Sequence, residues 1–102
     1  MTKKESDFAH DVLKPRLESE FPGCVIIKQD PNTSFQVVTD HIVLYEDKWA
    51  ALETKRTAKS KRQPNQEYYV GKFGEMSYAA FVDPSNIEEV MDDLQSAFRP
   101  DR

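Results

Sequence analysis

Two carboxylates and one lysine are spaced so that they could carry out phosphodiester chemistry. Twelve residues separate Asp40 from Glu53, and Lys55 follows two positions later. Carboxylates suit Mg²⁺, which takes oxygen ligands and keeps several of its waters. A bound metal polarises a phosphoryl oxygen and activates water, and a lysine can stabilise the charge that develops on the phosphate. These residues therefore predict a metal-dependent site for phosphodiester hydrolysis.

Two apolar segments must position these residues. Residues 35–45 and 49–55 each have the composition of a strand, and a short polar turn separates them. Because side chains alternate between the faces of a strand, Glu53 and Lys55 should project from the same face. A hairpin with this turn pairs the neighbourhood of Asp40 with that of Glu53, so we expect the three side chains to converge. As a bare string the pattern is common, and a surface hairpin with ordinary charges is the alternative interpretation.

Helices are expected at both ends of the chain and in its second half. Apolar residues at three- and four-residue spacing predict a helix over 5–21 that kinks or breaks at Pro15, where the backbone N–H is missing. A second helix is expected from Pro64. The pair Ser85 and Glu88 fits a capping box for a last helix. The aromatic residues expected to face inward from the second helix are Tyr68, Tyr69 and Phe73.

Further apolar runs at 24–27 and 77–82 predict two more strands. The order of elements is therefore α-β-β-β-α-β-α. The first three strands can form an antiparallel meander, and the fourth follows a helix, so it should join by a crossover. We predict an α/β (α+β) fold with a single mixed β-sheet of about four strands flanked by helices.

Size and composition limit the remaining alternatives. The chain has 102 residues, which is enough for one domain over 1–102. The single cysteine, Cys24, excludes a disulfide within the chain and a cysteine-based zinc cluster. No apolar run is long enough to cross a bilayer, so we expect no membrane partner and a cytoplasmic location, which is the host cytoplasm if a phage encodes the chain.

A basic segment directly follows the candidate site. The net charge is −4, which argues mildly against a general nucleic-acid binder. A local cluster of cations can still contact phosphates. A solvated loop is the alternative interpretation, but the position after Lys55 favours phosphate contact. The residues expected to contact DNA are Arg56, Lys59, Lys61 and Arg62.

The motif resembles that of a known nuclease superfamily. Thr39-Asp40, the triplet Glu53-Thr54-Lys55 and Gln66 in the following helix resemble the PD-(D/E)XK nucleases. The likeness is greatest to small phage and archaeal members related to Holliday-junction resolvases and VRR-NUC domains. The expected element order also resembles the restriction-endonuclease-like core of that superfamily over nearly the whole chain.

The resemblance implies a role for each residue of the motif. Asp40 and Glu53 would bind Mg²⁺, for which Mn²⁺ could substitute, and the Thr54 carbonyl would be a further ligand. Lys55 would be the catalytic lysine. The resemblance implies a metal-dependent endonuclease that hydrolyses DNA, with branched DNA as a candidate substrate. A homodimer with two active sites is expected because so small a domain covers little DNA alone.

Two helices are implied to add residues to this site. A glutamine in the helix after the motif often lies near the site, and Gln66 matches better than Gln63. The superfamily often adds a metal-binding glutamate from the first helix, where Glu5 fits best. The fallbacks for that glutamate are Glu18 and Glu20.

One departure favours a rival interpretation. Relatives commonly carry Gly-x-Pro-Asp before the second strand, whereas this chain has Val37-Val38-Thr39-Asp40. The loss of Gly and Pro removes a tight-turn signal. The rival is a non-enzymatic module that binds nucleic acid or protein, such as a phage interaction or anti-defence protein.

Strand alternation places His41 on the opposite face from the motif, which favours a structural role for it, and His10 should be exposed.

Overall fold

A computed structural model describes residues 5–29, 39–62 and 64–100, with the side chains of Glu5 and Ser6 outside that description. The chain begins with a helix in three parts, which are α1 (Glu5–Phe8), the π-helical turn η1 (Ala9–Leu13) and α2 (Lys14–Glu20). The elements that follow are β1 (Val25–Lys28), β2 (His41–Tyr45), β3 (Lys48–Thr54), α3 (Pro64–Met76), β4 (Tyr78–Val82) and α4 (Ile87–Phe98). The predicted fold class and order of elements are confirmed.

The four strands form one mixed sheet in the order β1-β2-β3-β4. The first three strands are antiparallel, and β4 pairs with β3 in parallel. The second strand is shorter than expected, because β2 begins at His41 and Asp40 lies in a bend just before it. The part of the expected strand over 35–38 lies outside the described residues.

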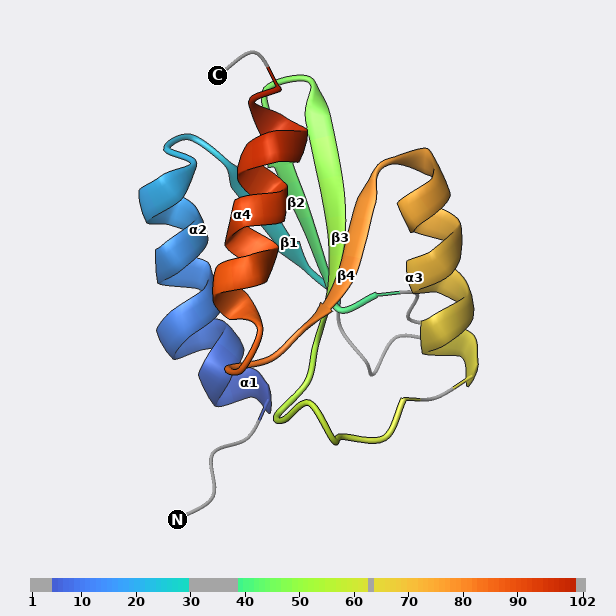
Figure 1. Cartoon of the computed structure of the whole chain (residues 1–102). Helices are drawn as coiled ribbons and strands as arrows, with labels where there is room; N and C mark the ends of the chain where they lie inside the picture. The colour runs from blue at the N-terminus through green and yellow to red at the C-terminus, as the bar shows by residue number, and fades with distance from the viewer. Residues whose placement is uncertain (1–4, 30–38, 63, 101–102) are drawn as a thin grey trace.

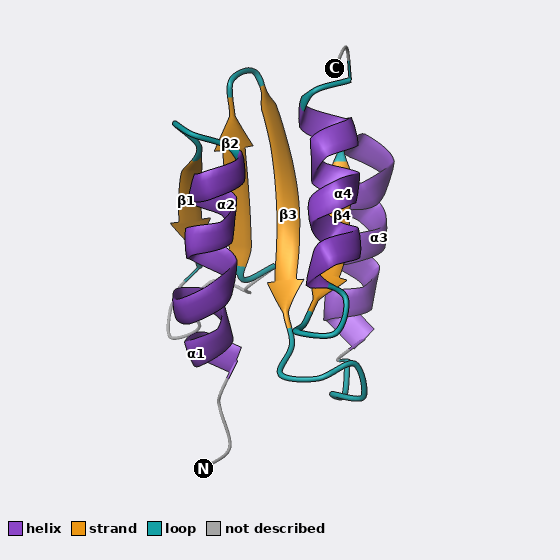
Figure 2. Cartoon of the chain, turned by 60° about the vertical axis from the view of Figure 1, so that its left-hand side comes forward, coloured by secondary structure: helices purple, strands orange, loops and turns teal. Residues whose placement is uncertain are grey.

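Helices cover both faces of the sheet (Figure 1). The first helix and α4 lie side by side on one face, here called the α2–α4 face, and α3 lies on the other, called the α3 face (Figure 2). The main core lies between the sheet and the helices α2 and α4. Alternation along the strands points one set of side chains toward this face, and these side chains are buried. Its most buried members are Leu13, Leu17, Phe21, Val43, Ala50, Leu52, Val82, Met91, Leu94 and Phe98.

Pro15 explains the π-helical turn in the first helix. A proline in a helix has no N–H to donate, and its ring collides with the carbonyl of the residue four positions earlier. The chain responds one residue ahead of Pro15, where the Lys14 N–H donates to the Ala9 carbonyl five positions back, the bond of a π-helix. The predicted irregularity is confirmed, and it takes the form of a widened turn that leaves Leu13 and Leu17 buried.

Two local predictions about helices are wrong. The capping box does not form, because the Ser85 hydroxyl donates to Asp83 and Asn86 takes the N-cap position without a side-chain cap bond. Tyr68 does not face inward and is 61% exposed. Helix α3 covers its side of the sheet with half-buried rings instead, and Phe73 meets Trp49 edge-on at 5.8 Å between ring centroids.

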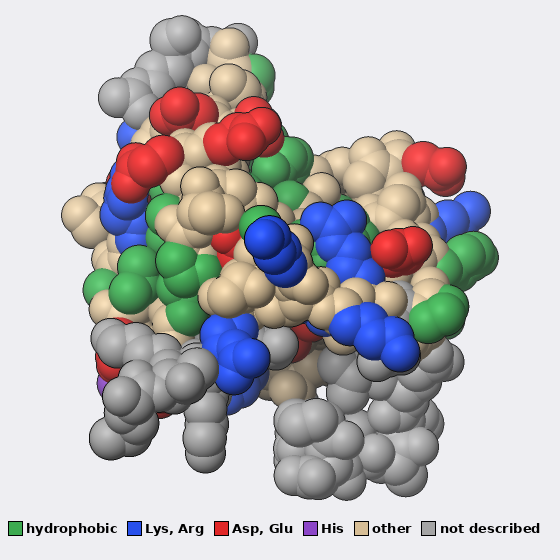
Figure 3. Space-filling model, turned by 60° about the horizontal axis from the view of Figure 1, so that its bottom comes forward, with side chains coloured by type: hydrophobic (Ala, Val, Ile, Leu, Met, Phe, Trp, Pro, Cys, Tyr) green, Lys and Arg blue, Asp and Glu red, His purple; other side chains and the backbone are tan. Residues whose placement is uncertain are grey.

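The ends of β1, β3 and β4 and the start of β2 all lie at one end of the sheet, at the bottom of Figure 1. Viewed from this end, Lys and Arg side chains spread across the middle of the surface (Figure 3).

The described part of the chain has no helix long and apolar enough to span a membrane.

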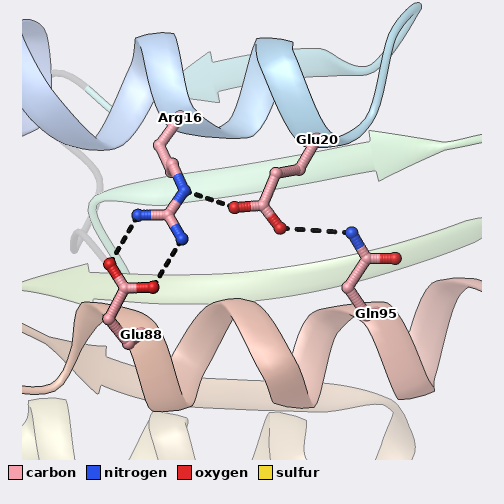
Figure 4. Close-up of polar contacts among 4 residues, drawn as sticks. All are labelled: Arg16, Glu20, Glu88 and Gln95. Carbon is pink, nitrogen blue, oxygen red and sulfur yellow. Dashed lines mark hydrogen bonds and ion pairs between the residues drawn. The ribbon is translucent and has the colours of Figure 1, made fainter.

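A polar bridge joins α2 and α4 over the core (Figure 4). The guanidinium of Arg16 donates to both oxygens of Glu88, at 2.7 and 2.6 Å, and also to Glu20. Gln95 completes the bridge by donating to Glu20 at 3.1 Å. The hydrogen bonds from Arg16 lower the pKa of the Glu88 carboxyl. Because this site is exposed to water, we assign the bridge to the alignment of the two helices rather than to a large share of stability.

Candidate active site

Backbone pairing places Asp40, Glu53 and Lys55 at the same end of the sheet. His41 pairs with Leu52 at the last registered position of β2 and β3, so Asp40 and Glu53 are the next residues beyond it. The Lys55 N–H donates to the Val82 carbonyl at 2.8 Å, which continues the pairing of β3 with β4 past the end of the strand. The predicted hairpin topology is confirmed.

The Asp40 carboxylate is held by three hydrogen-bond donors. The Thr54 N–H donates to its two oxygens at 3.0 and 3.1 Å, and the Thr54 hydroxyl also donates to it. The third partner is Nδ1 of His41, at 2.8 Å. Because backbone N–H groups at a strand end otherwise lack partners, these contacts tie the start of β2 to the end of β3.

Glu53 is an acid in an interior position. Its side chain belongs to the α3 face, its partner in β4 is Phe81, and it is only 4% exposed. Removing a carboxylate from water costs several kcal/mol, roughly, before partners or a metal offset that cost. A buried glutamate at the end of a central strand therefore requires a compensating cation or hydrogen-bond donors.

Lys55 is equally buried, at 6% exposure. Its amine donates to Oε1 of Gln66 at 2.7 Å and to the Lys61 carbonyl at 3.0 Å. Gln66 comes from the first turns of α3, so the predicted contribution of that helix is confirmed as a contact, while Gln63 lies outside the described residues. Lys55 is thus fixed between the strand end, the basic segment and α3.

The contacts divide into two groups on the two sides of β3. Asp40, Thr54 and His41 form one group, and both of its donor side chains belong by alternation to the α2–α4 face. Lys55 and Gln66 form the other group, on the α3 face with Glu53. The sequence predicted that the three side chains converge. The backbone brings the three residues to one end of the sheet, but the Asp40 carboxylate is turned toward Thr54 and His41, so the prediction is wrong for the Asp40 side chain.

The basic segment crosses the same end of the molecule. The side chains of Arg56, Lys59, Lys61 and Arg62 are all exposed. The guanidinium of Arg62 stacks on the ring of Phe81, with 3.9 Å from Cζ to the ring centroid, and Phe81 also lies 5.9 Å from the Lys55 amine. Figure 3 shows Lys and Arg side chains (blue) across the middle of this end. Phosphate groups could contact them there.

The predicted metal ligands come from different parts of the fold. Within residues 5–29, 39–62 and 64–100, no three or more His, Cys, Asp or Glu side chains are grouped so that they could hold a metal ion. The predicted ligands are the side chains of Asp40, Glu53 and Glu5 and the backbone carbonyl of Thr54. The backbone of Glu5 begins α1, but its side chain lies outside the description. The fallbacks Glu18 and Glu20 lie in the last turns of α2, at the opposite end of the molecule.

Three contacts were not anticipated from the sequence. Phe81 supplies the platform for Arg62 because parallel pairing brings β4 beside Glu53, a non-local fact that no local pattern encodes. Thr54 contributes its N–H and hydroxyl to Asp40, although only its carbonyl was considered. His41 is buried on the face opposite to the motif, as alternation predicted, yet it still reaches Asp40. The adjacency of His41 to Asp40 was the only signal for that contact.

Comparison of the chain with protein-family models, with curated proteins and with solved structures finds no match in any of the three. The resemblance to the PD-(D/E)XK nucleases therefore rests on the motif residues and the order of elements.

Proposed function

We propose that the chain is a metal-dependent endonuclease that hydrolyses phosphodiester bonds of DNA, with its active site at the shared end of β2 and β3. The observation that carries the proposal is the burial of two ionisable side chains, Glu53 and Lys55, at 4% and 6% exposure two residues apart on one strand. Stability alone does not favour such placement, because apolar residues of similar size would avoid the desolvation cost. Two buried ionisable side chains at the end of one strand therefore favour a role beyond stability.

The donor set fits a hard divalent cation. Asp40 and Glu53 offer carboxylate oxygens, and the Thr54 carbonyl offers a third oxygen between Glu53 and Lys55 in sequence. Mg²⁺ takes oxygen ligands of this kind and needs only one or two carboxylates from the protein, and Mn²⁺ accepts the same ligands. A bound cation of this class would polarise a phosphoryl oxygen and lower the pKa of bound water.

Lys55 is suited to stabilise charge on the reacting phosphate. An ammonium group has three N–H donors, and Lys55 directs two of them to Gln66 and to the Lys61 carbonyl. Among the described residues these are the hydrogen bonds of the amine, which leaves its third donor for a substrate oxygen. Both acceptors are uncharged, so the full positive charge persists for the phosphate. In this proposal Gln66 is a positioning residue, because it acts on the substrate only through the amine of Lys55.

The basic segment would hold the DNA strand beside the site. Arg56, Lys59, Lys61 and Arg62 are exposed, and the Phe81 ring orients the guanidinium of Arg62. Contacts of this type depend on phosphate charge and weaken steeply as salt rises. Branched DNA remains a candidate substrate. The homodimer and the cytoplasmic location stay predictions.

A second candidate function is a binding module without catalysis. The observation that favours it is the engagement of Asp40 with Thr54 and His41, because a carboxylate with three donors already has a structural role. For a metal to bind between Asp40 and Glu53, the Asp40 carboxylate must break some of its hydrogen bonds to Thr54 and His41. The two functions make different predictions about metal and cleavage.

Cleavage of DNA in the presence and absence of metal tests the proposal. Supercoiled plasmid and a four-way junction are incubated with the chain in Mg²⁺, in Mn²⁺ and in EDTA. We expect nicked or linear products with either metal and none in EDTA, and loss of products with Glu53→Gln, which removes the charge at constant shape. Cleavage that continues in EDTA would refute the metal requirement. Junction binding without cleavage of either substrate in either metal would instead establish the binding module.

A further inference from the structure

A second cationic site lies on the far side of Asp40 from Lys55. A cavity of about 300 Å³ opens between the π-helical turn and the sheet. Its volume is at the lower end of the range for small-molecule sites, roughly 300–1,000 Å³. The described residues that line it are Ala9, His10, Lys14, Ile26, Lys28 and His41.

The cavity lining carries positive charge, although the protein has a net charge of −4. Lys14 and Lys28 come from different elements, and neither forms an ion pair within the described part of the chain. The nearby acids Asp11 and Asp40 are each hydrogen-bonded to a histidine and are not among the lining residues. Two amines that line one cavity without an opposite charge in its lining repel each other, and an anion between them would reverse that repulsion.

The π-helical turn shapes one wall of this cavity. Ala9 and His10 lie within η1, and Lys14 follows it directly, so the widened turn caused by Pro15 supplies three of the lining residues. Single π-helical turns inside α-helices often occur at functional sites. The turn therefore places His10 and Lys14 in the cavity lining together with Lys28.

The other wall combines apolar surface with a fixed histidine. Ile26 of β1 is half-buried beside the cavity, and His41 is 6% exposed. Because Nδ1 of His41 contacts Asp40, its Nε2 is the ring nitrogen that a ligand can meet. A ligand that suits this cavity carries a compact anionic group for the amines and a less polar body for Ile26 and Ala9.

We propose that this cavity binds the phosphate of a nucleotide, with the sugar or base against Ile26. Phosphate oxygens accept charge-assisted hydrogen bonds from Lys14 and Lys28, and lysine is a common phosphate-binding residue. The inference does not need the proposed nuclease, because binding requires neither metal nor cleavage. If the nuclease proposal also holds, the site holds a nucleotide other than the one being cut, since His41 and Asp40 separate it from Lys55.

Binding is measured by amide chemical shifts of the full chain in EDTA. The three probes are a nucleoside 5′-monophosphate, the same nucleoside without its phosphate, and inorganic phosphate. We expect the nucleotide to shift the amides of Lys14, Ile26, Lys28 and His41 in a saturable way, inorganic phosphate to bind more weakly, and the nucleoside to cause no shift. Equal affinity for inorganic phosphate would refute the nucleotide as ligand. Absent shifts, or shifts spread over Lys48 and Lys72, would refute the site.

Substitution of the two amines tests the assignment. The double variant Lys14→Gln and Lys28→Gln should bind the nucleotide about a hundredfold more weakly, because each of the two lost charged hydrogen bonds costs about tenfold. Both side chains are exposed, so the fold should be retained and the thermal midpoint unchanged. The matched control changes Lys48 and Lys72 to Gln, which lie outside the cavity and should leave binding unchanged. Equal loss in both double variants would show general charge attraction and overturn the proposal.

Discussion

Lys55→Met should lower the rate of DNA cleavage about a hundredfold to a thousandfold without lowering the free energy of unfolding. The rate falls because one preorganised cationic donor at a reacting phosphate contributes about that factor. Stability should be equal or higher, because the variant removes a charge that is 6% exposed and whose hydrogen-bond acceptors, Gln66 and the Lys61 carbonyl, are uncharged. The two measurements are plasmid cleavage in Mg²⁺ and denaturant unfolding.

The control for this variant is Lys48→Met. Lys48 begins the same strand at its other end and contacts Asp47 at 3.0 Å. Its loss should leave cleavage unchanged. If Lys55→Met cleaves normally, Lys55 is not part of the reaction. If it instead unfolds at much lower denaturant, the lysine is a structural tie between β3 and α3.

Phe98→Ala should destabilise the fold by about 3–5 kcal/mol, the usual cost of removing a buried ring. The side chain is 2% exposed at the end of α4 and packs edge-on against Phe21 at 5.1 Å and beside Tyr45 at 5.7 Å between ring centroids. Domains of this size have a total stability of about 5–15 kcal/mol, so the loss is a large fraction of it. Denaturant unfolding measures the change, with the slope expected to stay constant.

Phe73→Ala is the matched comparison on the other face of the sheet. Its ring is half-buried and touches Trp49 and Tyr69 rather than the main core. Burial of apolar area sets the size of the effect, so this variant should lose clearly less stability. Equal losses at Phe98 and Phe73 would contradict the assignment of the main core to the α2–α4 face.

The spacing of apolar residues along the chain predicted the features that are set within a single helix or strand. Alternation in β3 placed Glu53 and Lys55 on one face, and helical spacing placed Leu13 and Leu17 in the core, because each pattern reflects the geometry of a single element. Gln66 was placed near the motif by the resemblance to the PD-(D/E)XK nucleases rather than by this pattern, and the structure shows its contact with Lys55.

Local sequence patterns could not predict which of several acceptors a side chain bonds, or which segments far apart in the chain come into contact. Ser85 has the sequence of a capping box, but its hydroxyl bonds Asp83 instead, because a turn offers it a nearer acceptor. Tyr68 is apolar enough for a core, yet α3 has only one side against the sheet and this residue lies outside it. The Arg62–Phe81 contact requires the parallel register of β3 and β4, which tertiary structure alone sets.

The position of the Asp40 carboxylate is the main feature of the site that was predicted wrongly. Strand alternation for a strand that included Asp40 would point it toward Glu53. In the fold β2 starts one residue later, so Asp40 is free of strand geometry and bonds Thr54 and His41. A metal site at this strand end therefore requires a local rearrangement of one side chain, which makes metal binding the decisive question.

Titration of Mn²⁺ into the metal-free chain tests the central claim most directly. A paramagnetic ion broadens the amide signals nearest to it, so its position can be read without any cleavage. We predict broadening centred on Asp40, Thr54 and Lys55 that Mg²⁺ reverses and Glu53→Gln abolishes. Broadening confined to the acidic helix α4, around Glu88, Glu89, Asp92 and Asp93, or no broadening at all, would contradict a metal-dependent active site at the end of β3.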